Sequence, residues 1–285
     1  MESREWRVGS YQFTVFSKQL ASSNNSDFDP KSFFIPHPSS LILLLHGFTG
    51  SRKNWFFLAP KLVELGYTVV VPDILGHGES DAPEDAEAYR MERITADILS
   101  HFPQPITVLG YSMGGRLALY MAVNFPEKVN RLILESSSPG LADSTERQAR
   151  IESDNALADL ILENGIEAFV NRWEAVPLFA SQKRLPAERQ KGLRAQRLGN
   201  RPIGLANSLR GMGTGQQPSL WDDLDQLQIP ILLLAGDLDR KFVAIGKQML
   251  TQLPNANLQI IEDAGHTIHF EKPTLYAKLM CEWLS

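Results

Sequence analysis

The chain has 285 residues, enough for one or two domains with a sizeable core, and 43% of them are hydrophobic, as in an ordinary folded protein. Its net charge of −5 argues against nucleic acid as a partner, because that partner needs a basic surface. A single cysteine, Cys281, excludes a disulfide framework and a cysteine-rich metal site. The aliphatic runs are too short to span a bilayer, and residues 1–17 do not resemble a secretory signal. We therefore expect a cytoplasmic protein without membrane insertion.

Short aliphatic runs alternate with amphipathic stretches along most of the chain. The sequence predicts an N-terminal hairpin, then a polar, proline-rich loop at residues 21–40. Nearly continuous hydrophobic runs, typical of strands buried on both faces of a parallel sheet, follow at 41–45, 68–72, 105–110, 131–136, 229–236 and 257–263. Helices are predicted at 55–65, 91–101, 112–125, 241–252 and 272–284. This alternation predicts an α/β fold with a mostly parallel central sheet flanked by helices.

Residues 139–222 interrupt the alternation, because they contain no good strand. The pattern predicts helices at about 144–163, 166–173, 187–198 and 202–212. We expect a core made of residues 1–138 and 223–285, with residues 139–222 inserted as a helical lid, called the lid segment below. Nine of the 17 arginines but only two of the 11 lysines lie in this segment. The planar guanidinium suits carboxylates, so we expect most of these arginines to be solvated and a few to face a ligand.

The first chemical motif is Gly110-Tyr111-Ser112-Met113-Gly114, which fits G-x-S-x-G between a predicted strand and a predicted helix. That context is typical of a nucleophile elbow, where a sharp turn exposes the serine and small neighbours let the chain pass. The segment LLLHGFTGS supplies a second strand end. We expect the backbone N–H groups of Phe48 and Met113 to form an oxyanion hole, and the side chain of His46 to brace the loop.

A serine nucleophile needs a base, and the base needs a carboxylate that orients it. Asp239 and His266 follow two later strands, and the order Ser, Asp, His along the chain is typical of α/β-hydrolases. We assign Asp239 as the orienting carboxylate and His266 as the base. Asp237 is the alternative carboxylate, and His269 is the alternative base.

The other glycine and histidine patterns do not predict a nucleotide or metal site. The G-x-G at residues 76–78 lacks the third glycine of a dinucleotide fingerprint, and GMGTG at residues 211–215 lacks the ending of a P-loop. No spacing of histidines, cysteines and acids is typical of a metal site.

From about residue 40 to the end, the chain resembles the α/β-hydrolase superfamily. The resemblance rests on HGFTGS, PDILGHGES, GYSMGG, GDLD and AGH. Longer strings resemble the 2-succinyl-6-hydroxy-2,4-cyclohexadiene-1-carboxylate synthases, lyases of menaquinone and phylloquinone biosynthesis; they are LHGFTGSRKNW, GYSMGGRLAL, ESSSPGLADSTERQARIESD, LRGMGTGQQPSLW, GDLDRKF and AGHTIHFEKP. These strings lie in both the predicted core and the lid segment.

The resemblance implies a polycarboxylate small molecule as substrate. Arg116 stands one helical turn after Ser112, and the motifs match it, Arg150 and Arg197 to substrate-binding arginines of that family. Arg194 competes with Arg197 for the inward position. Tyr111 and Trp173 match other residues that line the pocket.

The resemblance also implies an elimination instead of a hydrolysis. Ser112, activated by His266 and Asp239, would remove a ring proton, and the oxyanion hole would hold the resulting enolate while enolpyruvate leaves. No cofactor or metal is implied. Two other functions remain as alternatives: a carboxylesterase, thioesterase or C–C hydrolase with the same triad, and a weakly catalytic small-molecule receptor on the same fold.

Overall fold

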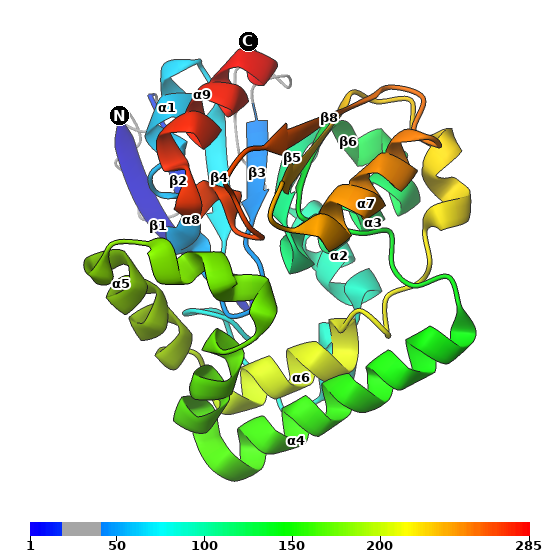
Figure 1. Ribbon diagram of the computed structural model, residues 1–285. Helices are drawn as coiled ribbons and strands as arrows, with labels where there is room; N and C mark the ends of the chain where they lie inside the picture. Colours follow the sequence, from blue (N-terminus) through cyan, green and yellow to red (C-terminus); the bar gives the residue numbers. More distant parts are fainter. Residues whose placement is uncertain (19–40) are drawn as a thin grey trace.

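The computed structural model describes residues 1–18 and 41–285. A single eight-stranded sheet runs through the molecule in the order β1-β2-β4-β3-β5-β6-β7-β8 (Figure 1). Its strands are β1 Glu2–Val8, β2 Tyr11–Ser17, β3 Leu41–Leu45, β4 Thr68–Pro72, β5 Ile106–Tyr111, β6 Val129–Glu135, β7 Ile231–Gly236 and β8 Ala256–Ile261. β1 and β2 form an antiparallel hairpin, β2 pairs antiparallel with β4, and the remaining pairs are parallel. The predicted sheet and hairpin are confirmed, whereas the loop predicted at 21–40 lies outside the described residues. β8 lies at the edge of the sheet and is only partly buried, so the run at 257–263 is not covered on both faces as expected.

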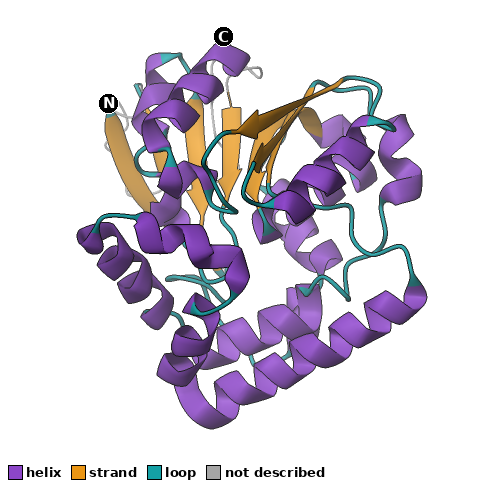
Figure 2. Cartoon of the chain, viewed as in Figure 1, coloured by secondary structure: helices purple, strands orange, loops and turns teal. Residues whose placement is uncertain are grey.

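Helices cover both faces of this sheet (Figure 2). On one face lie α2 (Met91–Ser100), α3 (Met113–Asn124) and α7 (Arg240–Leu250). On the other lie α1 (Ala59–Glu64), the short α8 (Ile268–Glu271) and α9 (Pro273–Leu284). Every residue of β3, β5 and β7 is buried, because helices pack on both of their faces.

The helix predicted at 55–65 is shorter than expected. It begins at Ala59, and residues Arg52–Trp55 form a 3₁₀ turn before it. The backbone N–H of Arg52 donates to Asp73 Oδ1 (2.6 Å), and its guanidinium pairs with the other oxygen of the same carboxylate. This buried pair fixes the segment against the end of β4, so a continuous helix cannot form there.

The lid segment contains α4 (Ser144–Glu174), a 3₁₀ stretch (Pro177–Arg184), α5 (Ala187–Leu198) and α6 (Pro202–Met212). α4 breaks at Gly165, whose φ of 80° and ψ of 174° are not helical, so its two halves match the two helices predicted there. Figure 1 shows α4 and α6 side by side across the edge of the sheet where the parallel strands end. Their apolar side chains, among them Ile161, Phe169 and Leu205, form a core of their own that Phe48 joins from the sheet side. Within the described part of the chain, no helix has the length and apolar character needed to cross a membrane.

Candidate active site

Ser112 lies on the tight turn between β5 and α3. Its φ of 51° and ψ of −108° are rare for a residue with a side chain, and such backbone strain costs about 1–3 kcal/mol. The turn is held because the Ser112 N–H donates to the Glu135 carbonyl (2.8 Å) and its own carbonyl accepts the Arg116 N–H (2.9 Å). A Cβ at Gly114 would lie 2.5 Å from the Leu45 carbonyl oxygen, and one at Gly110 would collide with Gly114. The glycines of the motif are therefore required by close packing.

The imidazole of His266 joins Ser112 to Asp239. Its Nε2 lies 3.0 Å from Ser112 Oγ, and its Nδ1 lies 2.6 Å from Asp239 Oδ2. Asp239 and His266 are buried and follow β7 and β8 at the same edge of the sheet as Ser112. A carboxylate on Nδ1 keeps the proton there and leaves Nε2 free to accept the hydroxyl proton. The structure thus brings together the three residues predicted as a triad.

The two alternative triad residues lie elsewhere. Asp237 Oδ1 accepts the Ala264 N–H (3.3 Å) and so closes the turn after β7. His269 is fully buried, and its Nδ1 lies 2.9 Å from both carboxylate oxygens of Glu135 while its ring stacks on Trp55. Neither contacts Ser112, so the geometry supports Asp239 and His266.

Phe48 and Met113, the predicted oxyanion-hole residues, line one cavity together with Ser112. Met113 is the first residue of α3, where N–H groups have no partner inside the helix. Within residues 1–18 and 41–285, neither the Phe48 N–H nor the Met113 N–H donates a hydrogen bond. Both amides are therefore available to a negatively charged oxygen beside Ser112.

His46 braces the loop that carries Phe48, as predicted. Its Nε2 accepts the Ile74 N–H (2.9 Å), and its Nδ1 lies 2.8 Å from the Gly47 carbonyl oxygen. Burial lowers the pKa of His46 to about 4, so the imidazole is neutral near pH 7. Its nitrogens hold the backbone and do not take part in the triad.

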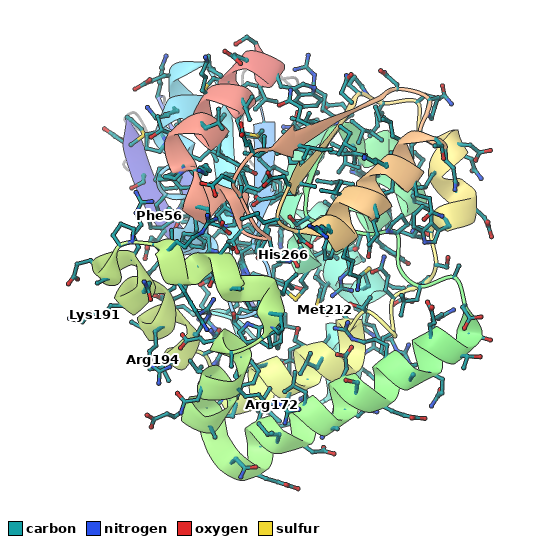
Figure 3. The ribbon with its side chains drawn as sticks, viewed as in Figure 1. Phe56, Arg172, Lys191, Arg194, Met212 and His266 are labelled. Carbon is teal, nitrogen blue, oxygen red and sulfur yellow. The ribbon has the colours of Figure 1, made fainter. Side chains whose placement is uncertain are left out.

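The cavity beside Ser112 has a volume of about 890 Å³ and lies between the sheet and the lid segment. His266 lines it from the sheet side, and Met212 at the end of α6 lines it from the lid side (Figure 3). Four of the predicted substrate-binding residues line this cavity: Tyr111, Arg116, Arg150 and Trp173. Arg197 does not.

Arg116 is the cation nearest to the nucleophile in the sequence, and its partners are neutral. Its Nη1 donates to the Met212 carbonyl (2.9 Å) and to Gln217 Oε1 (3.1 Å). Burial, helped by the charge of Arg150 and opposed by that of Asp154, lowers the pKa of Arg116 to about 10, so it stays charged at neutral pH. A partly buried cation without a carboxylate partner favours an anionic ligand.

Arg150 and Arg197 differ in their access to the cavity. Arg150 Nε lies 2.8 Å from Asp154 Oδ1, and the Arg150 side chain is 41% exposed. Arg197 is buried, with Nη1 3.0 Å from Glu174 Oε1 and Nη2 2.7 Å from Gln182 Oε1. It lines a separate space of about 30 Å³ behind Trp173. The expectation that Arg197 shares the pocket of Arg116 is therefore not met, because Glu174 and Gln182 hold it behind the cavity wall.

Arg194 is the outward member of the pair on α5. Its Nη1 lies 2.7 Å from Glu174 Oε2 and its Nη2 2.7 Å from Asn171 Oδ1. Figure 3 shows it on the outer side of α5, away from His266. Glu174 thus binds both arginines, one on each carboxylate oxygen, and Arg197 is the more buried of the two.

Tyr111 and Trp173 form part of the wall between the two spaces and line both. The Tyr111 hydroxyl lies 3.4 Å from Thr267 Oγ1, and its ring lies 5.5 Å from the His266 ring. The Trp173 ring packs edge-on against Phe48 at 5.4 Å. Its indole N–H is buried and has no acceptor among the described residues.

Comparisons with known proteins agree with this architecture. Residues 40–273 match the family described as alpha/beta hydrolase fold. The chain is 45% identical over 254 residues to a Bacillus subtilis (strain 168) protein provisionally named 2-succinyl-6-hydroxy-2,4-cyclohexadiene-1-carboxylate synthase, covering 88% of this chain and 92% of that protein. It is 31% identical to the Serratia proteamaculans (strain 568) synthase of that name, covering 83% and 89%. It also superposes on MenH from S. aureus with a TM-score of 0.85 and 35% identity, covering 95% and 97%.

The chain belongs to the 2-succinyl-6-hydroxy-2,4-cyclohexadiene-1-carboxylate synthase family. The resemblance stated from its sequence motifs is therefore confirmed, and so is the α/β-hydrolase fold class.

Ser136 and Ser137 also line the cavity, and the sequence analysis did not predict them. The pairing of Tyr111 with Glu135 places Ser136 beside Ser112 at the end of the neighbouring strand. Ser136 has a φ of 48°, and both hydroxyls line the cavity, are buried and have no partner among the described residues. The segment ESSSPG could have indicated them, since it is a polar run directly after a strand and ligands bind at the carboxyl ends of parallel strands.

The described residues offer no metal site. In residues 1–18 and 41–285, no group of three or more histidine, cysteine, aspartate or glutamate side chains could hold a metal ion. His46 and His77 lie close, with ring centroids 5.2 Å apart, but burial lowers the pKa of His77 to about 3 and both rings pack beneath the Phe48 loop. In this structure His46 holds the loop backbone and His77 packs against Phe48.

Proposed function

We propose that this protein is a carbon–oxygen lyase that acts on 2-succinyl-5-enolpyruvyl-6-hydroxy-3-cyclohexene-1-carboxylate. It releases pyruvate and forms 2-succinyl-6-hydroxy-2,4-cyclohexadiene-1-carboxylate for menaquinone or phylloquinone biosynthesis. The observation that carries the proposal is the cation of Arg116, which has only neutral hydrogen-bond partners and lines the same cavity as Ser112 and His266. A substrate with three carboxylates suits such a cavity, and the names of the synthase relatives support this reaction.

The proposed chemistry begins with a proton transfer. His266 Nε2 accepts the Ser112 proton, and Ser112 Oγ removes the proton from the ring carbon next to the succinyl carbonyl. The C–H electron pair forms a conjugated enolate, whose oxygen accepts hydrogen bonds from the Phe48 and Met113 N–H groups. The enolate then reforms the carbonyl while the ring carbon–oxygen bond to enolpyruvate breaks. The leaving group takes up the proton that His266 holds, which returns the triad to its starting state, and tautomerises to pyruvate.

Substrate binding falls to the residues that line the large cavity. Arg116 and Arg150 bind carboxylates, while Tyr111 and Trp173 pack against the ring. Arg197 is assigned a bracing role instead, since its contacts with Glu174 and Gln182 hold the wall from behind.

The proposed division into core and lid follows the cavity. Residues 1–138 and 223–285 supply the triad, and residues 139–222 cover it and exclude water, which a hydrolase would have to admit. Only side chains and backbone amides take part, so the reaction needs no cofactor or metal. A cytoplasmic location remains a prediction from the sequence.

A coupled assay tests the proposal. The purified protein is given the enolpyruvyl substrate, and pyruvate is measured as NADH oxidation by lactate dehydrogenase. We expect pyruvate release, and a loss of about 10⁴-fold or more in Ser112→Ala because the base is gone. Ser100→Ala, a substitution at an exposed residue at the end of α2, is the matched control and should keep the wild-type rate.

The same triad could also carry out acyl transfer, so ester cleavage is the competing outcome. Para-nitrophenyl butyrate is offered to the same preparations. Rapid ester cleavage without any pyruvate would favour a carboxylesterase or thioesterase and reject the lyase.

A further inference from the structure

The charge of Arg116 is left uncompensated by its direct contacts. Its two hydrogen-bond acceptors are a backbone carbonyl, that of Met212, and a side-chain amide, that of Gln217. The acid whose charge influences it, Asp154, is within ion-pair distance of Arg150 (2.8 Å) and not of Arg116. Both acceptors bind Nη1, so the rest of the guanidinium is free of hydrogen bonds from the described residues.

Gln217 is placed to fix this cation. It is fully buried just after α6. Its Oε1 accepts from Arg116 (3.1 Å), its Nε2 donates to the Ser138 carbonyl (3.4 Å), and its backbone N–H donates to the Gly213 carbonyl (3.1 Å). The amide therefore connects the end of the lid segment to Arg116 on α3 and to the loop that follows β6.

A glutamine fits this position for two reasons. One end must accept from a cation and the other must donate to a carbonyl, and an amide has one group of each kind. A carboxylate of the same shape would pair with Arg116 and cancel the positive charge that a substrate carboxylate needs. It would also repel that substrate carboxylate as a like charge.

We propose that Gln217 is a positioning residue that fixes the Arg116 guanidinium for a carboxylate of the substrate and leaves its positive charge for that carboxylate. The role rests on the proposed function only for the identity of the substrate. It predicts that Gln217 controls the affinity for anions through Arg116, without touching the reacting atoms.

Two substitutions separate the two parts of this role. Gln217→Glu keeps the shape and neutralises Arg116. We therefore expect KM for the enolpyruvyl substrate to rise tenfold or more, because the substrate carboxylate loses a charge-assisted hydrogen bond. Gln217→Met removes the hydrogen bond but adds no charge, so its KM should rise less. In both variants kcat should change less than KM.

Gln216→Glu is the matched control. It adds the same negative charge one position earlier, at a partly exposed side chain that makes no hydrogen bond among the described residues, and should leave KM within about twofold of the wild type. A second check combines Gln217→Met, which adds no charge, with Arg116→Met. If Gln217 acts through Arg116, Gln217→Met should not raise KM further in that background.

Calorimetric titration with succinate, a simple dicarboxylate, provides a readout that does not depend on turnover. Wild type and Gln216→Glu should bind it, while Gln217→Glu and Arg116→Met should bind at least tenfold more weakly. The inference is overturned if Gln217→Glu keeps wild-type affinity and KM, or if it only lowers Tm and kcat. It is also overturned if Arg116→Met does not weaken succinate binding. If succinate binding follows the expected order but the wild type releases no pyruvate, the inference stands and the proposed function fails.

Discussion

The triad residues at the strand ends and the arginines of the lid segment are held in position by different interactions. Ser112, Asp239 and His266 follow the neighbouring ends of parallel strands, and His266 lies 3.0 Å from Ser112 and 2.6 Å from Asp239. Arg150 and Arg197 lie on helices, and their positions depend on the acids next to them, Asp154 and Glu174. Sheet geometry therefore positions the triad, whereas local ion pairs determine which lid arginines line the cavity.

The largest effect should come from the strand ends. Asp239→Asn should lower kcat for pyruvate release by about 10⁴-fold, because an amide on Nδ1 favours the wrong imidazole tautomer. Asp237→Asn makes the same change two residues away, where the side chain only closes a turn. It should cost less than tenfold. Equal losses in the two variants would mean that Asp239 is not the orienting carboxylate.

The next effect sharpens the contrast between two arginines. Arg116→Met should raise KM about a hundredfold, since it removes the cation that faces the cavity. Arg197→Met should raise KM only a few-fold and mainly lower Tm, because it leaves Glu174 and Gln182 without one of their partners. Steady-state kinetics and thermal unfolding of both proteins decide this. A similar rise in KM for Arg197→Met would show that the residue reaches the substrate.

The smallest effect concerns the stability of the strand-end loops. Burial lowers the pKa of His46 to about 4 and that of His77 to about 3, from 6.5 in the unfolded chain. Both histidines have a lower pKa in the folded protein than in the unfolded chain. Their contribution to the free energy of unfolding is therefore complete above pH 6.5. It is lost as pH falls from 6.5 toward 4, by about 1.4 kcal/mol per histidine and pH unit.

Urea unfolding of the wild type and of His77→Gln, at pH values from 7 to 4.5, measures this loss. The variant should have a shallower decline of the unfolding free energy with acid. Parallel curves for the two proteins would contradict the burial of a neutral His77.

The sheet and the triad could be predicted because local sequence determines them. LILLL and ILLLA are hydrophobic at every position, as expected for short strands covered on both faces. The glycines around Ser112 reveal the tight turn that exposes it. Asp239 and Asp237 could not be separated by composition, and the structure separates them by the direction in which each side chain points.

The cavity wall could not be predicted, because it depends on contacts between distant segments. Arg197 matches a substrate-binding arginine by motif, yet Glu174, 23 residues earlier, holds it behind Trp173. Gln217 lies 101 residues from Arg116, and no local pattern connects them. The start of α1 was misplaced for a similar reason, since the bond between Arg52 and Asp73 spans 21 residues.

The most direct test of the central claim is the rate of pyruvate release, in a single turnover, from substrate carrying deuterium on the ring carbon next to the succinyl carbonyl. If Ser112 acts as the base that breaks this C–H bond, release should be several-fold slower than from the unlabelled substrate. An identical rate for the two substrates would contradict proton removal by Ser112 as the step on which the reaction depends.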